Sequence, residues 1–142
     1  MIAITLPQVH DHSTEAAIAK PCDIHAEIVA NYPDLLGGAQ EGFVLFVLNS
    51  QNRILKHKLV ALGGAAECHV DAKILFHTAL TTVGATGFAV AHNHPSGVLE
   101  PSRADIALTK QLASGGELLC LKLVDHLIFH GCRFVSFAQD WR

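Results

Sequence analysis

The chain reads GFAVAHNHPSG over residues 87–97 and PSRAD over residues 101–105, and this stretch decides how the rest is interpreted. The small and apolar residues 87–91 predict a short buried strand that delivers His92 and His94 at its end. Side chains alternate along a strand, so the two imidazoles point to the same side. Together with Ser102 and Asp105 they form the spacing H-x-H-x₇-S-x-x-D. Two imidazoles, a carboxylate from the next element and one open position are typical of catalytic rather than structural zinc.

Ser102 and Asp105 also fit a purely structural role. Ser-x-x-Asp at a helix start is typical of a capping box, in which each side chain satisfies a backbone N–H of the first turn. Pro101 supports a helix boundary here, and the sequence predicts a helix over 102–114 that ends at the glycine pair 115–116. The two roles are compatible, because a carboxylate at a helix start can reach a metal and a capping hydroxyl can still face a reacting group.

The segments around this stretch predict one α/β domain. Residues 1–20 are mixed and polar, so we expect an N-terminal arm followed by a single domain over 21–142. The pattern of apolar residues and turn residues predicts helices over 23–30 and 71–82, strands over 42–48 and 53–60 with a turn at 49–52, and further short apolar runs at 118–124, 127–129 and 134–137.

Composition limits the classes of function. The chain has 142 residues and a formal net charge of −3, so it lacks the basic excess of an electrostatic nucleic-acid binder. The longest apolar run, 43–48, is too short to cross a bilayer, and the N-terminus does not resemble a secretory signal. The four cysteines form no C-x-x-C pair. We therefore expect a cytoplasmic protein with reduced thiols and no membrane association.

A hydrolytic metal site also needs a base beside the water that attacks the substrate. The carboxylates ahead of the histidines are Glu15, Glu27, Glu41 and Glu67. Glu41 directly precedes the apolar run 43–48, which would hold it on rigid structure, but its spacing equally fits a solvated charge beside a strand.

His92 and His94 likewise have a plainer interpretation as buried imidazoles that bond backbone carbonyls. Two histidines on one face, next to a tight Pro-Ser-Gly turn, favour a metal site over that alternative.

These residues carry a resemblance to a known family. The string AHNHPSG at 91–97, with Ser102, Asp105, the Leu-Thr pair at 108–109 and DHLI at 125–128, resembles the RadC family of JAB/MPN+ (JAMM-type) metalloprotease-like domains. Further matches extend the resemblance over roughly residues 20 to 138, in order and at ordinary spacing. The resemblance implies a three-layer α/β fold of the cytidine-deaminase-like (JAB/MPN) type, with a central mixed β-sheet flanked by helices.

The same resemblance implies a site and a reaction. It implies one zinc ion per chain held by His92, His94 and Asp105, with water in the fourth position. It also implies that Glu41 is the general acid/base and that Ser102 stabilises the oxyanion. JAMM-type relatives hydrolyse peptide or isopeptide bonds, and the RadC branch is linked to DNA repair. The resemblance supplies no substrate.

The sequence departs from longer RadC proteins in one respect. Those proteins carry a helix-hairpin-helix region ahead of the similar part, whereas about twenty residues precede it here. We expect a standalone form without that region. With a net charge of −3, a protein or peptide substrate is expected rather than direct contact with nucleic acid. The oligomeric state stays open.

Three other motifs suggest different chemistry. His25-Ala26-Glu27 matches the H-A-E of zinc deaminases, but the P-C-x-x-C that should follow is absent. The contiguous letters H-N-H at 92–94 do not match the nuclease class of that name, which draws its three residues from separate positions. Asp125 and His126 lie between two apolar runs, and we expect them to orient a loop at a strand boundary or to support the metal ligands from outside.

Two hypotheses follow. The first is a zinc-dependent hydrolase of an amide bond. The alternative is a catalytically silent scaffold or binding module of the RadC family, acting in DNA repair or mobile-element biology. The full set of Glu41, His92, His94, Ser102 and Asp105 favours the first, because a scaffold has no chemical use for an open metal position. A nucleic-acid phosphodiesterase would want a basic groove, and no basic residues cluster in the sequence.

Overall fold

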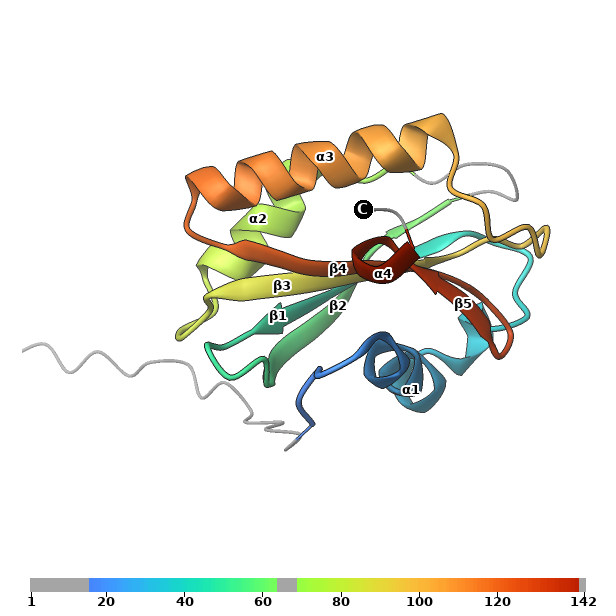
Figure 1. The fold of residues 1–142 in the computed structure, drawn as a ribbon, viewed down its shortest axis with the longest axis horizontal. Helices are drawn as coiled ribbons and strands as arrows, with labels where there is room; N and C mark the ends of the chain where they lie inside the picture. The colour runs from blue at the N-terminus through green and yellow to red at the C-terminus, as the bar shows by residue number, and fades with distance from the viewer. Residues whose placement is uncertain (1–15, 64–68, 141–142) are drawn as a thin grey trace, which may run out of the picture.

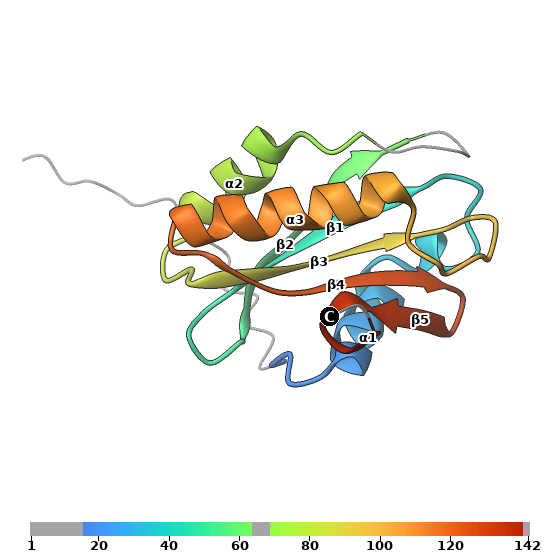
Figure 2. The same cartoon turned by 45° about the horizontal axis from the view of Figure 1, so that its top comes forward.

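The computed structural model describes residues 16–63 and 69–140, which form one mixed β-sheet with helices on both faces (Figures 1 and 2). Most of the predicted arm, together with Glu15, Glu67 and Cys68, lies outside the described residues. In chain order the elements are α1 (Pro21–Asn31), a 3₁₀ turn η1 (Pro33–Leu35), β1 (Gly42–Leu48), β2 (Ile54–Leu62), α2 (Ala72–Leu80), β3 (Gly87–Asn93), α3 (Arg103–Leu118), β4 (Lys122–His130), β5 (Arg133–Ser136) and α4 (Phe137–Asp140).

The strand order is β2-β1-β3-β4-β5, which places β3 in the middle of the sheet. β3 pairs with β4 in parallel, and the other neighbours pair antiparallel. The connection between the two parallel strands runs through α3, as a parallel crossover requires. The predicted α/β class with a central mixed sheet flanked by helices is therefore confirmed.

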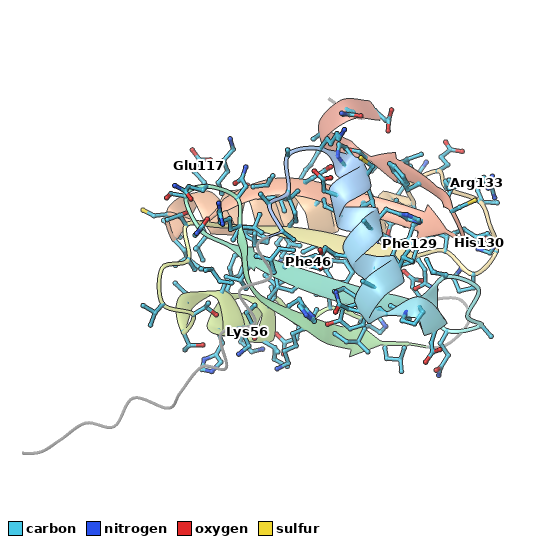
Figure 3. The ribbon with its side chains drawn as sticks, turned by 90° about the horizontal axis from the view of Figure 1, so that it is seen from below. Phe46, Lys56, Glu117, Phe129, His130 and Arg133 are labelled. Atoms are coloured by element: carbon cyan, nitrogen blue, oxygen red, sulfur yellow. The ribbon has the colours of Figure 1, made fainter. Side chains whose placement is uncertain are left out.

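Every residue of β1 and of β3 is buried, because both faces of the sheet are covered. Helix α1 covers one face, and α2 with α3 cover the other (Figures 1 and 2). Figure 3 looks onto the α1 face, where Phe46 of β1 and Phe129 of β4 lie on either side of that helix. The α1-side core also contains Ile24, Ile28, Val44, Ala89, Ala91 and Leu127, and the opposite core contains Phe43, Leu45, Leu75, Phe88, Val90 and Leu112.

Helix α3 differs from the prediction at its C-terminal end. It continues through Gly115 and Gly116 and ends at Leu118, with Cys120 in the left-handed region at φ 57°. Gly116 is needed for close packing: a Cβ atom there would lie 2.3 Å from the carbonyl oxygen of Leu121 and 2.9 Å from the Phe88 ring. The glycine therefore lets the helix approach the sheet, whereas the sequence alone suggests a stop.

Strand β4 also differs from the prediction. The apolar runs 118–124 and 127–129 were expected to be separate, but one strand spans Lys122–His130, with Asp125 and His126 buried inside it. A buried polar pair is tolerated because its groups are bonded. Asp125 accepts hydrogen bonds from the Ser136 hydroxyl (2.6 Å) and from the backbone N–H of His126 (2.7 Å). The expected strand boundary at this pair is therefore wrong.

Within the described part of the chain, no helix combines the length and the apolar character needed to cross a bilayer.

Candidate metal centre

Three elements meet at one end of the sheet, where β3 ends and α3 begins (right-hand end in Figure 1). β3 carries His92 and leads directly to His94, the first turn of α3 carries Asp105, and Glu41 directly precedes β1. One ligand atom from each of these four side chains lies within 4.8 Å of the other three. The predicted metal ligands and the predicted base are therefore close enough together to hold a metal ion between them.

The short distances within this group involve the two imidazoles and the Asp105 carboxylate. The Nε2 atoms of His92 and His94 are 3.0 Å apart. Asp105 Oδ2 lies 3.1 Å from His94 Nε2, and Oδ1 lies 3.3 Å from His92 Nε2. Glu41 Oε1 is farther away, at 3.7 Å from His92 Nε2. The Asp105 carboxylate and the two imidazoles thus form a group of three with short contacts, and the Glu41 carboxylate lies beside it.

The His94 ring is oriented by its other nitrogen. His94 Nδ1 lies 2.7 Å from the carbonyl oxygen of Val98, and a carbonyl only accepts, so Nδ1 donates its N–H there. In neutral His94 the Nε2 lone pair therefore faces the Asp105 carboxylate. Lone pairs at these distances need a positive charge between them, which a metal ion or a proton can supply. Accordingly, the hydrogen bond with Asp105 raises the pKa of His94 above its usual value, although burial opposes it.

Asp105 combines the capping role with a position among the candidate metal ligands. Its Oδ2 accepts a hydrogen bond from the Ser102 backbone N–H (2.8 Å), and its own N–H donates to Ser102 Oγ (3.0 Å), so the predicted capping box is present. Burial alone would raise the pKa of Asp105, but the contacts with His92 and His94 and the Ser102 N–H outweigh burial and hold this pKa far below its ordinary range. Asp105 is therefore an anion, aimed at the imidazoles by its helix.

Glu41 is held in place through the backbone on both sides of it. The Asn93 side chain accepts a hydrogen bond from the Gly42 N–H (2.7 Å) and donates one to the Gln40 carbonyl (2.9 Å). Asn93 is 1% exposed and lies between the two histidines in sequence, so β3 itself fixes the segment that carries Glu41. Asn93 thus holds the backbone on either side of Glu41.

Ser102 is exposed and acts as the N-cap of α3. Because its oxygen accepts from Asp105 N–H, its single hydroxyl hydrogen stays available to donate elsewhere. The capping prediction for Ser102 is confirmed, and its oxyanion role stays a prediction.

Two side chains from the β4–β5 hairpin hold the loop after His94, and sequence reasoning missed both. His130 Nδ1 donates to the His94 carbonyl (3.0 Å), and Arg133 donates to the Gly97 carbonyl (3.1 Å). Figure 3 shows His130 and Arg133 together at this end of the sheet. Gly97 adopts φ 81°, a conformation that suits glycine and closes the turn. Nothing in the local sequence reveals these contacts, since they depend on strand pairing.

A pair of contacts also supports His92 from behind. His92 Nδ1 is 2.7 Å from His126 Nε2, and His126 Nδ1 is 2.6 Å from Thr109 Oγ1. His126 is fully buried, and burial lowers its pKa well below the usual value, so it is neutral. The expectation that the Asp-His pair supports the metal ligands from outside is thus met by His126 alone. Asp125 instead bonds the Ser136 hydroxyl and the Ala138 N–H.

The deaminase-like triplet lies away from the site. His25 belongs to α1, on the opposite face of the sheet, where its Nε2 lies 2.8 Å from the Gly131 carbonyl and its ring stacks on Phe134. It orients a turn and approaches no candidate ligand.

Comparison with known proteins agrees with this geometry. The sequence model of the RadC-like JAB domain family matches residues 18–141. The chain belongs to the RadC family. Similar RadC-family relatives include UPF0758 proteins of Flavobacterium johnsoniae, 41% identical over 101 residues, and Methanosarcina acetivorans, 36% identical over 123 residues. A third, from Trichormus variabilis, is 42% identical over 103 residues.

The matches cover 71%, 87% and 72% of this chain but only 43%, 52% and 42% of those relatives, respectively. The chain thus spans about half the length of the curated relatives that it matches. The mixed sheet with helices on both faces is consistent with the JAB/MPN fold that the resemblance implied.

Proposed function

We propose that this RadC-family chain is a zinc-dependent hydrolase of the JAMM type that cleaves an amide bond, either peptide or isopeptide, with water. His92, His94 and Asp105 would hold one zinc ion, Glu41 would be the general acid/base, and Ser102 would stabilise the oxyanion. The observation that carries this proposal is the convergence of these ligand atoms and of Glu41 within 4.8 Å. We further propose a cytoplasmic location and a protein or peptide substrate, with a link to DNA repair as the family resemblance suggests.

The donor set suits zinc. In a tetrahedral site with bonds of about 2.0–2.1 Å, neighbouring ligand atoms lie roughly 3.3 Å apart. The three distances among His92 Nε2, His94 Nε2 and the Asp105 oxygens are 3.0, 3.1 and 3.3 Å. Three protein ligands would leave the fourth position open, which is the catalytic arrangement.

The chain's own residues account for the proton movements of hydrolysis. Zinc, when bound, acts as a Lewis acid on the carbonyl and lowers the pKa of water to about 7. Glu41 would accept the proton that water loses as its oxygen bonds to the carbonyl carbon. Glu41 would then return that proton to the nitrogen as the C–N bond breaks. The Ser102 hydroxyl would donate to the carbonyl oxygen while negative charge develops there.

Glu41→Gln tests the role of the base separately from metal binding. We expect the variant to keep its zinc, since His92, His94 and Asp105 remain, while turnover falls by about 10²–10⁴-fold. The measurement pairs elemental analysis with hydrolysis of a library of peptides and isopeptide-linked lysine conjugates. Glu27→Gln is the matched control, because Glu27 is a half-buried carboxylate of α1 on the opposite face of the sheet. Unchanged turnover in Glu41→Gln would show that the base is misassigned.

The same library separates the enzyme from the scaffold alternative. If the wild-type chain binds zinc and turns over no member of the library, the scaffold or binding role in DNA repair or mobile-element biology becomes the better account.

A further inference from the structure

A line of hydrogen bonds, buried at its His92 end and partly buried at Thr109, runs from His92 back to the main chain of α3. His92 Nδ1 lies 2.7 Å from His126 Nε2, His126 Nδ1 lies 2.6 Å from Thr109 Oγ1, and Thr109 Oγ1 lies 2.7 Å from the Asp105 carbonyl. His92 is 1% exposed and His126 is fully buried, so water does not compete for the bond between the two rings, while the two bonds of Thr109 are partly buried. The line therefore starts at one candidate ligand and ends on the backbone of another.

The position of each hydrogen follows from the Asp105 carbonyl oxygen, at which this line of bonds ends. A carbonyl oxygen only accepts, so the single hydroxyl hydrogen of Thr109 must lie toward Asp105. The Thr109 oxygen then accepts from His126 Nδ1, which carries an N–H. His126 is fully buried and contacts the rings of Phe43 and Phe137, where burying a charge is costly, so it is a neutral imidazole with one N–H.

The remaining assignments concern His92. Since His126 Nδ1 holds the hydrogen of that ring, its Nε2 is an acceptor, and His92 Nδ1 must donate to it. A neutral His92 then has no hydrogen on Nε2. That nitrogen is the atom that lies 3.0 Å from His94 Nε2 and 3.3 Å from Asp105 Oδ1.

We propose that Thr109 and His126 are positioning residues that fix the Nδ1–H tautomer of His92 and so keep its Nε2 lone pair directed at the metal centre. This inference rests on the proposed metal site and extends it to two residues that touch neither metal nor substrate. A histidine that binds a metal through one ring nitrogen usually donates the N–H of its other nitrogen to a fixed partner. Loss of that partner weakens metal binding.

The residues packed around His126 fix the orientation of its ring. The Phe137 ring stacks on His126 at a centroid distance of 4.8 Å and an interplanar angle of 14°. Phe137 is the first residue of α4, and that helix start is bonded to the Asp125 carboxylate through Ala138 N–H (3.0 Å). Asp125 therefore acts indirectly, by holding the element that packs on His126.

Thr109→Val tests the proposal because valine keeps the shape of threonine and removes the hydroxyl. In metal-free protein, we expect imidazole ¹⁵N spectra to show His92 as the Nδ1–H tautomer in the wild type and as a mixture in Thr109→Val. Zinc affinity, measured by chelator competition, should fall by about tenfold or more in this variant. Thr109→Ser restores the hydroxyl and should restore both the tautomer and the affinity.

Thr78→Val is the matched control. The Thr78 hydroxyl makes the same bond to the carbonyl four residues earlier, at 2.9 Å from Ile74 O, but in α2. We expect no change in the His92 tautomer in that variant. An unchanged Nδ1–H population in folded Thr109→Val would overturn the proposal, whatever zinc does. Because the tautomer is read without metal or substrate, a failure of the proposed function is distinguishable from a failure of this one.

Discussion

A single carboxylate oxygen links the start of α3 to the candidate metal centre. Asp105 Oδ2 lies 2.8 Å from the Ser102 N–H and 3.1 Å from His94 Nε2. The capping bond fixes the carboxylate before any ion arrives, so little side-chain freedom is left to lose on binding. The capping interpretation of the spacing S-x-x-D is therefore confirmed, and the same bonds hold the carboxylate where the proposed metal role needs it.

Zinc binding should weaken as the pH falls. The hydrogen bond with Asp105 raises the pKa of His94 above 6.5, so a proton competes with the metal at a higher pH than on a free imidazole. Above that raised pKa His94 is neutral and affinity should be flat. Below it, the dissociation constant should increase about tenfold per pH unit for each proton displaced. Chelator competition between pH 6 and 8 measures this. A constant affinity over that range would contradict the assignment of His94 as a ligand.

At the level of single residues, the sequence predicted some partners and concealed others. His92, His94 and Asp105 lie within fourteen positions, so strand alternation and helix capping are enough to bring them together. Glu41 is 51 positions from His92; its place ahead of a strand made it a candidate base, and the family resemblance selected it. The sequence singled out His126 only as part of an Asp-His pair that could support the ligands, and it did not point to the hydroxyl of Thr109. The contact of His126 with His92 depends on the parallel pairing of β3 with β4, in which Val90 lies opposite His126.

At the level of elements, β3 organises the site from both of its faces. Side chains alternate along β3, so His92 points toward α3, whereas the Asn93 side chain bonds the backbone on either side of Glu41. The elements were predictable where the local signal is strong, as in the continuous apolar run of β1, and less so where packing overrides local preference. Gly115 and Gly116 look like a helix end in sequence, yet α3 runs through them because Gly116 lies against Leu121 and Phe88.

Gly116→Ala should destabilise the fold even though alanine favours helix. The added Cβ would lie 2.3 Å from the Leu121 carbonyl oxygen, a backbone atom that cannot move aside easily. Overpacking of this kind costs about 1–3 kcal/mol, against a gain of up to about 1 kcal/mol in helix propensity. Urea denaturation should therefore show a lower midpoint.

Gly115→Ala is the comparison for that variant, because its Cβ would meet only the Phe76 ring, at 3.0 Å. We expect a smaller loss there. A Gly116→Ala protein as stable as the wild type would show that the close approach of α3 to the sheet is not required.

At the level of the whole molecule, the sheet separates helix α1 from the candidate metal centre. α1 covers one face without contributing a ligand, and its H-A-E triplet only orients a turn. The other face and the end of β3 bring together donors from β3, α3 and the segment before β1. The α/β class could be predicted from the alternation of elements. The order β2-β1-β3-β4-β5 could not, because strand pairing is long-range.

The zinc content of the purified chain tests the central claim most directly. Elemental analysis of protein prepared without chelators should give about one zinc ion per chain, and Asp105→Ala should lose it. Asp23→Ala is the matched control: Asp23 caps α1 through the Lys20 N–H at 3.0 Å but faces no imidazole pair. This control should keep its zinc. A wild-type chain without metal, or an Asp105→Ala chain that retains zinc, would contradict the assignment of His92, His94 and Asp105 as a zinc site.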